Sequence, residues 1–315
     1  MRILITGGAG CLGSNLIEHW LPLGHDLLVI DNFSTGNRET LPAGLPKLAI
    51  VAGSVADRAL VDRVFADFAP THVVHSAAAY KDPDDWWEDV ASNVLGSINV
   101  VAAARAAKVE RFVNFQTALC YGAPERVPIP VDHTCRPVAS YGISKTAGEA
   151  YVAASGLPFV SLRLASIIGP RLTIGAIPTF YQRLKAGKPV FCTTAMRDFL
   201  AMSDFLAFMD LAMGTGAPTG IFNLGPGRGH SIKDVLVAVA AAINVPVPDP
   251  IDIRPAGTDD VETVVLDPAG TMKTFGWNAQ VSFEKAIADM VRWYDAHGIS
   301  AIHSHLKAPE ESTRP

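Results

Sequence analysis

Long apolar runs, basic clusters, cysteine pairs and internal repeats are all missing from this sequence of 315 residues. Without a run of roughly 18 apolar residues no membrane helix is expected, and the strand-like start Met1–Ile5 predicts no signal peptide. A net charge of −5 with no basic run argues against nucleic acid as the main partner. The four cysteines have neither CxxC nor zinc-type spacing, so we expect free thiols, a cytoplasmic protein and no metal site.

The sequence does contain a regular alternation of strand-like and helical segments. Runs rich in β-branched residues predict strands at Arg2–Thr6, Asp26–Ile30, Leu48–Val51, 72–79, Arg111–Thr117 and 159–165. Helices are expected at Cys11–Leu23, Ala59–Phe68, Asp84–Ala107 and from about Tyr141 onwards. Strands joined by helices of this length imply right-handed crossovers and a parallel sheet. Such a sheet binds ligands at the carboxyl ends of its strands.

A glycine-rich segment, "ITGGAGCLGSN", follows the first strand directly and opens a helix. Gly7, Gly10 and Gly13 have the spacing GxxGxxG, which permits a tight turn, close approach of a pyrophosphate, and packing of helix on strand. The helix N-terminus adds free amides and a partial positive charge. With the acidic residue that follows, the segment favours dinucleotide binding over a purely structural turn.

That acidic residue is Asp31, at the end of "LLVID". A carboxylate there can accept hydrogen bonds from both ribose hydroxyls and would repel a 2′-phosphate. Asn32 and Phe33 follow it, and neither could neutralise such a phosphate. NAD is therefore favoured over NADP. The alternative is that Asp31 only caps a turn.

These patterns predict a Rossmann-type, doubly wound parallel sheet with a smaller mixed α/β C-terminal lobe for the substrate. After Gly169-Pro170 helices mix with short strands, and no flexible linker separates the two parts. We expect an NAD-binding domain at 1–168 with a returning segment near 197–225, and a substrate lobe at 169–196 and 226–306. The polar residues 307–315 are expected to form a disordered tail.

A Tyr/Lys pair stands in "SYGISKTAGEA". Tyr141 and Lys145 are four residues apart, so both side chains project from one face of a helix. A free tyrosine is a poor base, since its pKa is about 10. A neighbouring ammonium and a positively charged nicotinamide would both favour the phenolate and lower that pKa. Lys145 could also bond the nicotinamide ribose.

The chain resembles the extended short-chain dehydrogenase/reductase family, the nucleotide-sugar epimerases and dehydratases, over nearly its whole length. The segments that carry the resemblance are "TGGAGCLG", "DNFSTG", "HSAAA", "NVLGSIN", "YGISK", "LRLASIIGP", "RDF" and "FNLG". The resemblance implies that Tyr141 is the catalytic base, Lys145 its partner, and Thr117 the residue that bonds the reacting sugar hydroxyl. It also implies contacts to NAD from Gly7, Gly10, Cys11, Leu12, Gly13, Asp31, Asn32, Ser34, Thr35, Gly36, Ser54, Val55, Ala77, Ala78, Ala79, Lys81, Asn93, Tyr141 and Lys145.

The two residues after Thr117 bear on the reaction type. Relatives that eliminate water carry Asp-Glu there, relatives that decarboxylate a uronic acid carry the Glu, and 3,5-epimerases carry a Cys. This chain has Ala118 and Leu119 instead, and Cys120, one residue further along a continuing strand, should face the other way. The resemblance therefore implies a 4-epimerase that acts on a nucleotide sugar, a UDP-hexose or a derivative, through a 4-keto intermediate.

The resemblance also implies the residues that hold the substrate. Arg197 in "RDF" and Arg254 match cations that bind the diphosphate, although each could instead form a surface ion pair. Ser166 stands where the family usually has Asn, and Ser54 where it usually has Asp. The expected substrate contacts are Lys81, Thr117, Ala118, Leu119, Tyr141, Ser166, Arg197, Arg254 and Val264.

Two expectations concern the pocket wall and the long helix. Tyr80 is placed over the hexose, and the small Val264 leaves room for a sugar substituent. Trp86 and Trp87 are expected to pack in or beside the long helix. By resemblance, that helix and the one from Tyr141 would form a homodimer interface. The open alternatives for function are a 4-ketoreductase that exchanges its cofactor, a dehydratase, and a silent dinucleotide sensor.

Overall fold

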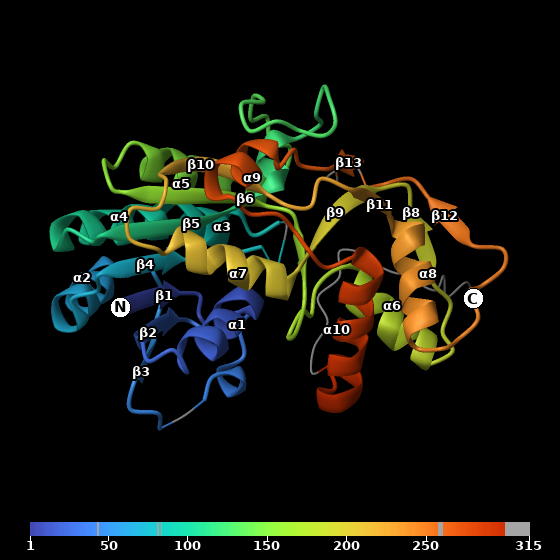
Figure 1. Cartoon of the computed structure of the whole chain (residues 1–315), viewed down its shortest axis with the longest axis horizontal. Coiled ribbons are helices and arrows are strands. Elements are labelled where there is room, and N and C mark those ends of the chain that lie inside the picture. Colours follow the sequence, from blue (N-terminus) through green and yellow to red (C-terminus); the bar gives the residue numbers. More distant parts are fainter. Residues whose placement is uncertain (43, 81, 83, 258–260, 300–315) are drawn as a thin grey trace, which may run out of the picture.

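The fold is a seven-stranded parallel sheet joined to a smaller lobe (Figure 1), in a computed structural model that describes residues 1–42, 44–80, 82, 84–257 and 261–299. In spatial order the strands are β10 (Gly220–Leu224), β6 (Phe159–Leu164), β5 (Arg111–Thr117), β4 (His72–His75), β1 (Arg2–Thr6), β2 (Asp26–Asp31) and β3 (Leu48–Ala52). Since all neighbours pair in parallel, their carboxyl ends share one edge of the sheet. The predicted Rossmann-type, doubly wound fold is confirmed.

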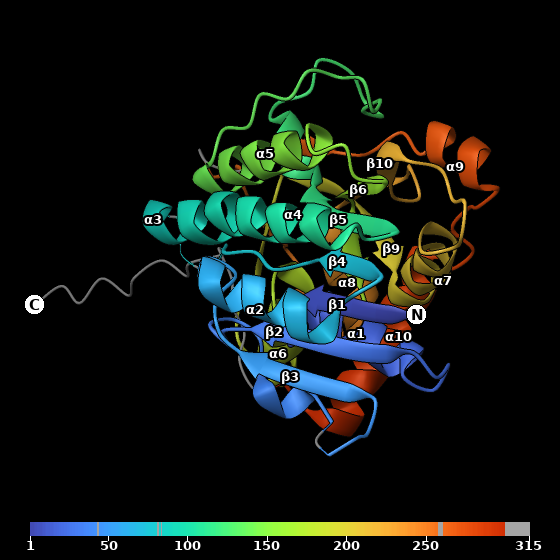
Figure 2. The same cartoon turned by 90° about the vertical axis from the view of Figure 1, so that its left-hand side faces the viewer.

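Helices cover both faces of this sheet (Figures 1 and 2). One face carries α2 (Arg58–Phe68), α4 (Gly96–Ala107) and α5 (Ser140–Ala153), and the other carries α1 (Cys11–Trp20) and α7 (Met202–Ala212). Along β1, Ile3 and Ile5 pack toward α1 and α7, whereas Leu4 packs toward α2 and α4. Burial on both faces explains why the strands read as continuous apolar runs.

The smaller lobe mixes short strands with helices around its own core (Figure 1). Its strands are β7 (Ser166–Ile168), β8 (Phe191–Thr193), β9 (Met196–Ala201), β11 (Gly229–Ser231), β12 (Asp252–Arg254) and β13 (Thr263–Val264). Its helices are α6 (Ala176–Lys185), α8 (Ile232–Ala242) and α10 (Phe283–His297), while α9 (Ala269–Phe275) lies against β10. The chain returns to the main sheet through α7 and β10; the domain boundaries themselves stay a prediction.

Near the carboxyl edge, two elements differ from the prediction. β4 ends at His75 instead of continuing to Ala79. The long helix begins later than Asp84, as α3 (Trp86–Asp89), then widens into a π-helical turn, η2 (Val90–Leu95), before α4. The helix starts after Asp85, whose side chain caps its first turn. The chain beyond β4 is held by Asn93, whose Oδ1 accepts the Ala79 N–H at 2.9 Å and whose Nδ2 donates to the Ala79 carbonyl at 3.0 Å. Asn93 lies in η2, and π-helical turns of this kind are frequent at functional sites.

The expectation that Trp86 and Trp87 pack beside the long helix is wrong. Their side chains are 66% and 87% exposed. In Figure 2 the first turn, α3, extends beyond the neighbouring layer, so there is little for these rings to pack against. Of that turn only Asp89 is buried.

The same continuous helix, Trp86–Ala107, is the one described segment with the length and hydropathy of a membrane span. Half of it is buried inside the protein, and its α4 portion packs against α2 and α5. It is therefore explained as a core helix of the fold.

Candidate active site

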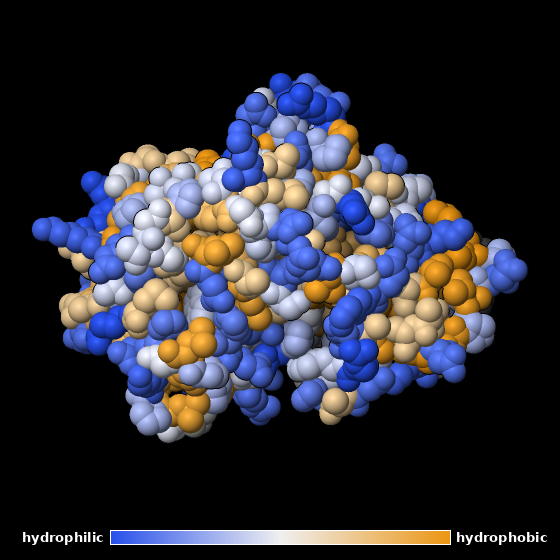
Figure 3. Space-filling model, in the orientation of Figure 1, coloured by the Kyte–Doolittle hydropathy of each residue, from blue (hydrophilic) through white to orange (hydrophobic). Residues whose placement is uncertain are grey.

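A cavity of about 400 Å³ lies at the carboxyl edge of the sheet, between the main sheet and the smaller lobe. Figure 3 shows the molecular surface notched between the two parts, with apolar side chains in separate patches. Most of the predicted contacts line the cavity: Gly7, Gly10, Cys11, Leu12, Asp31, Asn32, Ser34, Thr35, Ser54, Val55, Ala77, Ala78, Thr117, Ala118, Leu119, Tyr141, Lys145, Ser166, Arg197 and Val264. The structure does not place Gly13, Gly36, Ala79, Asn93 or Arg254 in its wall. Lys81 lies outside the described residues.

The glycine loop is packed so closely that side chains would collide with backbone. A Cβ on Gly7, whose φ is +67°, would lie 2.7 Å from the Ala77 Cα and N atoms. A Cβ on Gly13 would lie 2.6 Å from the Gly8 Cα, so this glycine serves helix packing without reaching the cavity. Gly10 caps α1 with no side-chain hydrogen bond, which leaves the first-turn amides for an anion.

Asp31 ends β2 and lines the cavity. Its carboxylate accepts the N–H groups of Ala9 and Phe33, both at 2.8 Å, so it does cap a turn. Each oxygen keeps a further lone pair for a ligand hydroxyl. Burial is the main cause that raises the pKa of Asp31. The two interpretations of this residue are therefore compatible, and the loop, the uncapped helix and the carboxylate together fit a dinucleotide such as NAD.

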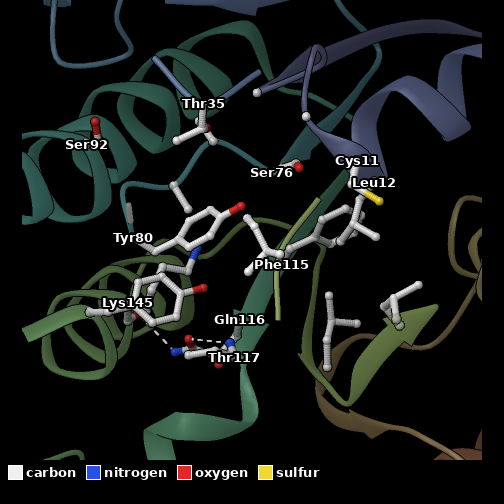
Figure 4. A pocket seen from close by; sticks show the side chains of 18 of the residues that line it. Cys11, Leu12, Thr35, Ser76, Tyr80, Ser92, Phe115, Gln116, Thr117 and Lys145 are labelled. Atoms are coloured by element: carbon white, nitrogen blue, oxygen red, sulfur yellow. Dashed lines mark hydrogen bonds between the residues drawn. The ribbon is translucent and has the colours of Figure 1, made fainter. Parts of the chain in front are cut away.

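The predicted catalytic residues Thr117, Tyr141 and Lys145 all line the cavity. Figure 4 shows Lys145 and Thr117 in its wall, together with Tyr80. Thr117 ends β5, and its side chain shares a hydrogen bond with that of Tyr141. The Tyr80 ring lies 5.7 Å from the Tyr141 ring, centroid to centroid. Glycines let α5 approach its neighbours, since a Cβ on Gly148 would lie 2.6 Å from the Asn93 carbonyl oxygen.

The pKa of Tyr141 departs from the sequence-based expectation. Burial raises it to about 12, although the hydrogen bond with Thr117 opposes this rise. Burial also lowers the pKa of Lys145 to about 8, while Glu149 acts in the opposite direction. In the protein alone, desolvation of the phenolate thus outweighs any help from the ammonium. Forming the phenolate near neutral pH therefore requires a further positive charge in the cavity.

The depressed pKa of Lys145 predicts a pH-dependent stability. Between pH 8 and the ordinary value of 10.5 the unfolded chain binds more protons at this position, so this contribution makes the free energy of unfolding rise with pH. Below that window the buried charge destabilises the fold. We expect Lys145→Met to be more stable than wild type at about pH 7 and to lose that advantage by about pH 10. Urea unfolding of both proteins across this range measures the difference, and parallel pH curves would contradict the prediction.

The chain after Thr117 turns instead of continuing as a strand, yet Cys120 faces away from the cavity, as predicted. Residues Ala118–Tyr121 form a 3₁₀ turn, η3, because the Thr117 hydroxyl accepts the Leu119 N–H at 3.1 Å. Cys120 is fully buried in a small apolar cluster and does not line the cavity. Leu119 does line it, so an apolar side chain faces the ligand at this position.

On the substrate side, Val264 is the parallel-strand partner of Arg197, and Ser166 lies on the neighbouring strand β7. All three line the cavity. Arg254 instead pairs with Asp252 at 2.6 Å and lies over the Phe191 ring at 4.1 Å. Its predicted contact with the diphosphate stays a prediction.

Sequence reasoning overlooked Ser92 and two larger buried polar residues in the cavity wall. Gln116 directly precedes Thr117, and Asp198 directly follows Arg197. Asp198 accepts the Leu266 N–H at 3.1 Å, and burial raises its pKa to about 7. The signal that could have found both is adjacency, because each stands next to a residue chosen from a motif.

Comparisons with known proteins identify the family of this chain. Residues 3–225 match the NAD dependent epimerase/dehydratase family. The enzyme WbmG of Bordetella bronchiseptica, solved in complex with NAD and UDP, is 60% identical, with 98% of each chain covered and a TM-score of 0.92. WbmH of the same organism, in complex with NAD+, is 42% identical over 94% of this chain and 99% of its own, with a TM-score of 0.89.

A curated relative, the UDP-glucose 4-epimerase of Corynebacterium glutamicum, is 32% identical over 310 residues, which cover 89% of this chain and 91% of that protein. The family match covers most of this chain and includes the glycine loop, Thr117, Tyr141 and Lys145. The resemblance predicted from the motifs is confirmed. The chain belongs to the NAD dependent epimerase/dehydratase family.

Proposed function

We propose that the protein inverts C4 of a nucleotide-activated hexose through a transient 4-keto sugar, with NAD as bound cofactor. One observation carries this proposal: Thr117, Tyr141 and Lys145 share a cavity with Leu119, and no carboxylate follows Thr117. The site can therefore move the proton of a sugar hydroxyl but holds no group beside Thr117 for eliminating water.

The chain's own residues have separate tasks in this reaction. Tyr141 accepts the proton of the C4 hydroxyl and later returns it. Thr117 holds that hydroxyl by a hydrogen bond, and Lys145 supplies positive charge beside the phenolate. NAD, when bound, would supply the acceptor for the hydride of C4 and the donor that gives it back to the opposite face of the sugar. Because the sugar must turn between these steps, the small Ala118 and Val264 in the wall favour the proposal.

The nucleotide is proposed to be UDP. A relative 60% identical is described in complex with NAD and UDP, and the curated relative acts on UDP-glucose by name. Arg197 stands in the cavity wall, where a guanidinium can bind a diphosphate through two parallel hydrogen bonds.

A 4-ketoreductase would use the same three residues but would consume its cofactor. We expect the purified protein to contain NAD close to one equivalent and to interconvert a UDP-hexose with its C4 epimer without added cofactor, because the hydride returns to the same sugar. NMR of the sugar products and chromatography of the nucleotide released on denaturation make the two measurements. Turnover that stops after one equivalent, or that depends on added NADH, would favour the reductase. Dehydration would instead give a 4-keto-6-deoxy sugar, and a silent sensor would give no product.

We infer that the protein is a cytoplasmic homodimer. The support lies on η2 and α5, which leave several apolar side chains exposed: Val90 at 51%, Leu95 at 46%, Ile143 at 54% and Tyr151 at 49%. Pairing these surfaces with those of a second copy would cover them. Analytical ultracentrifugation tests the dimer.

A further inference from the structure

We propose that Gln116 is a positioning residue, which fixes Thr117 relative to the helix that bears Tyr141 and Lys145. The proposal rests on the proposed function, since its purpose is to hold the sugar-binding hydroxyl in register with the catalytic base. Gln116 comes from β5 and is 2% exposed. Nothing in the reaction requires it to exchange protons.

The Gln116 amide makes two hydrogen bonds in opposite directions, drawn as dashed lines in Figure 4. Its Oε1 accepts the backbone N–H of Thr117 at 2.7 Å. Its Nε2 donates to the backbone carbonyl of Lys145 at 2.9 Å. One side chain thus joins the end of the catalytic strand to the catalytic helix, at the two residues whose separation matters.

Other buried bonds hold α5 at different points. The Asn93 Nδ2 donates to the Ser144 hydroxyl at 3.0 Å, on the side of η2. The Arg163 Nη2 bonds the Glu149 Oε2 at 2.7 Å, one turn beyond Lys145. These contacts orient the helix on the sheet. Gln116 differs from them because its second bond reaches the backbone of Thr117 itself.

Removing the two hydrogen bonds of the Gln116 side chain would let the end of β5 shift relative to α5. A displacement of about 1 Å between reacting groups can lower the rate by about 100-fold. The direct bond between the Thr117 and Tyr141 side chains remains, so we expect a smaller effect, about a tenfold lower kcat. KM should change less than twofold, roughly, because the cavity wall that holds the nucleotide is unaltered.

The test compares Gln116→Met with a matched control, Asn114→Leu. Asn114 lies two residues earlier on the same strand, is also 2% exposed, and donates from Nδ2 to the Ser161 hydroxyl at 3.0 Å without reaching Thr117 or Lys145. Both changes remove one buried amide, so similar thermal destabilisation is expected. Only Gln116→Met should lower kcat. Equal loss of kcat in both variants, or none in either, would overturn the proposal.

Gln116→Glu adds a pH signature. The protonated carboxyl still donates to the Lys145 carbonyl and accepts from Thr117, whereas the carboxylate has no donor. The kcat of this variant, relative to wild type, should recover as the pH falls. A ratio to wild type that does not change with pH would contradict the assignment.

A substrate-free measurement separates this proposal from the proposed function. In the protein as purified, amide hydrogen exchange at Thr117, followed by NMR, should be at least about tenfold faster in Gln116→Met and unchanged in Asn114→Leu. If wild type acts on no nucleotide sugar, the proposed function fails, and the exchange rate still decides the role of Gln116. An unchanged Thr117 exchange rate in Gln116→Met would contradict the proposal that Gln116 positions Thr117.

Discussion

Tyr141→Phe is expected to lower kcat by a factor of about 10²–10⁴ on every nucleotide sugar that wild type accepts. The change removes only the phenolic oxygen. In the cavity this oxygen is a hydrogen-bond partner of the Thr117 side chain. In the proposed reaction it takes the proton of the sugar hydroxyl. The two residues after Thr117, Ala118 and Leu119, carry no base, and η3 turns Cys120 into the core. Bound NAD and thermal stability should change little, because the ring itself remains.

The matched control is Tyr151→Phe, the same chemical change on the same helix. Tyr151 is 49% exposed and lies outside the cavity wall, so its activity should equal that of wild type. Steady-state kinetics with the epimers resolved by NMR measure both variants. Full activity in Tyr141→Phe would contradict the proposed mechanism. Equal losses of activity in both variants would indicate that the substitutions disturb α5 and do not act through the phenolic oxygen of Tyr141.

Gly7→Ala is expected to abolish cofactor binding and to cost about 2–5 kcal/mol of stability. The cost has two sources. Gly7 has a φ of +67°, which strains any residue with a Cβ. The added Cβ would also lie 2.7 Å from the backbone of Ala77, so the loop between β1 and α1 must move away from the segment that follows β4. That movement displaces the amides that would face the pyrophosphate.

Gly24→Ala separates these two costs. Gly24 has a φ of +82°, yet the nearest atom to its Cβ would be the flexible Lys47 Nζ at 3.7 Å. We expect only the strain of about 1–2 kcal/mol here, with NAD retained. Urea unfolding and the nucleotide content of the purified variants measure both effects. If Gly7→Ala costs no more than Gly24→Ala and keeps its NAD, the close contact with Ala77 has no consequence.

The parts of the site that the sequence predicts are those set by local patterns. The spacing of Gly7, Gly10 and Gly13 after a strand, and of Tyr141 and Lys145 on a helix, depends on backbone geometry within a few residues. The parallel sheet follows from the alternation of strands and helices for the same reason.

The parts that could not be predicted depend on which segments meet in space. The hydrogen bond from Gln116 to Lys145 joins residues 29 apart, and those between Asn93 and Ala79 join residues 14 apart. The pKa of Tyr141 is decided by how deeply α5 is covered. The exposure of Trp86 likewise depends on where the sheet layer stops beneath α3.

The register of β9 and β13 has a consequence for how substrate preference can diverge. Arg197 and Val264 are direct partners in this parallel pair, so backbone hydrogen bonds fix their relative positions whatever side chains they carry. Under the proposed function, a substitution at Val264 would then change the room beside the sugar while Arg197 stays in place. Relatives could thus exchange one sugar for another by single mutations, with the affinity for the nucleotide part inherited unchanged.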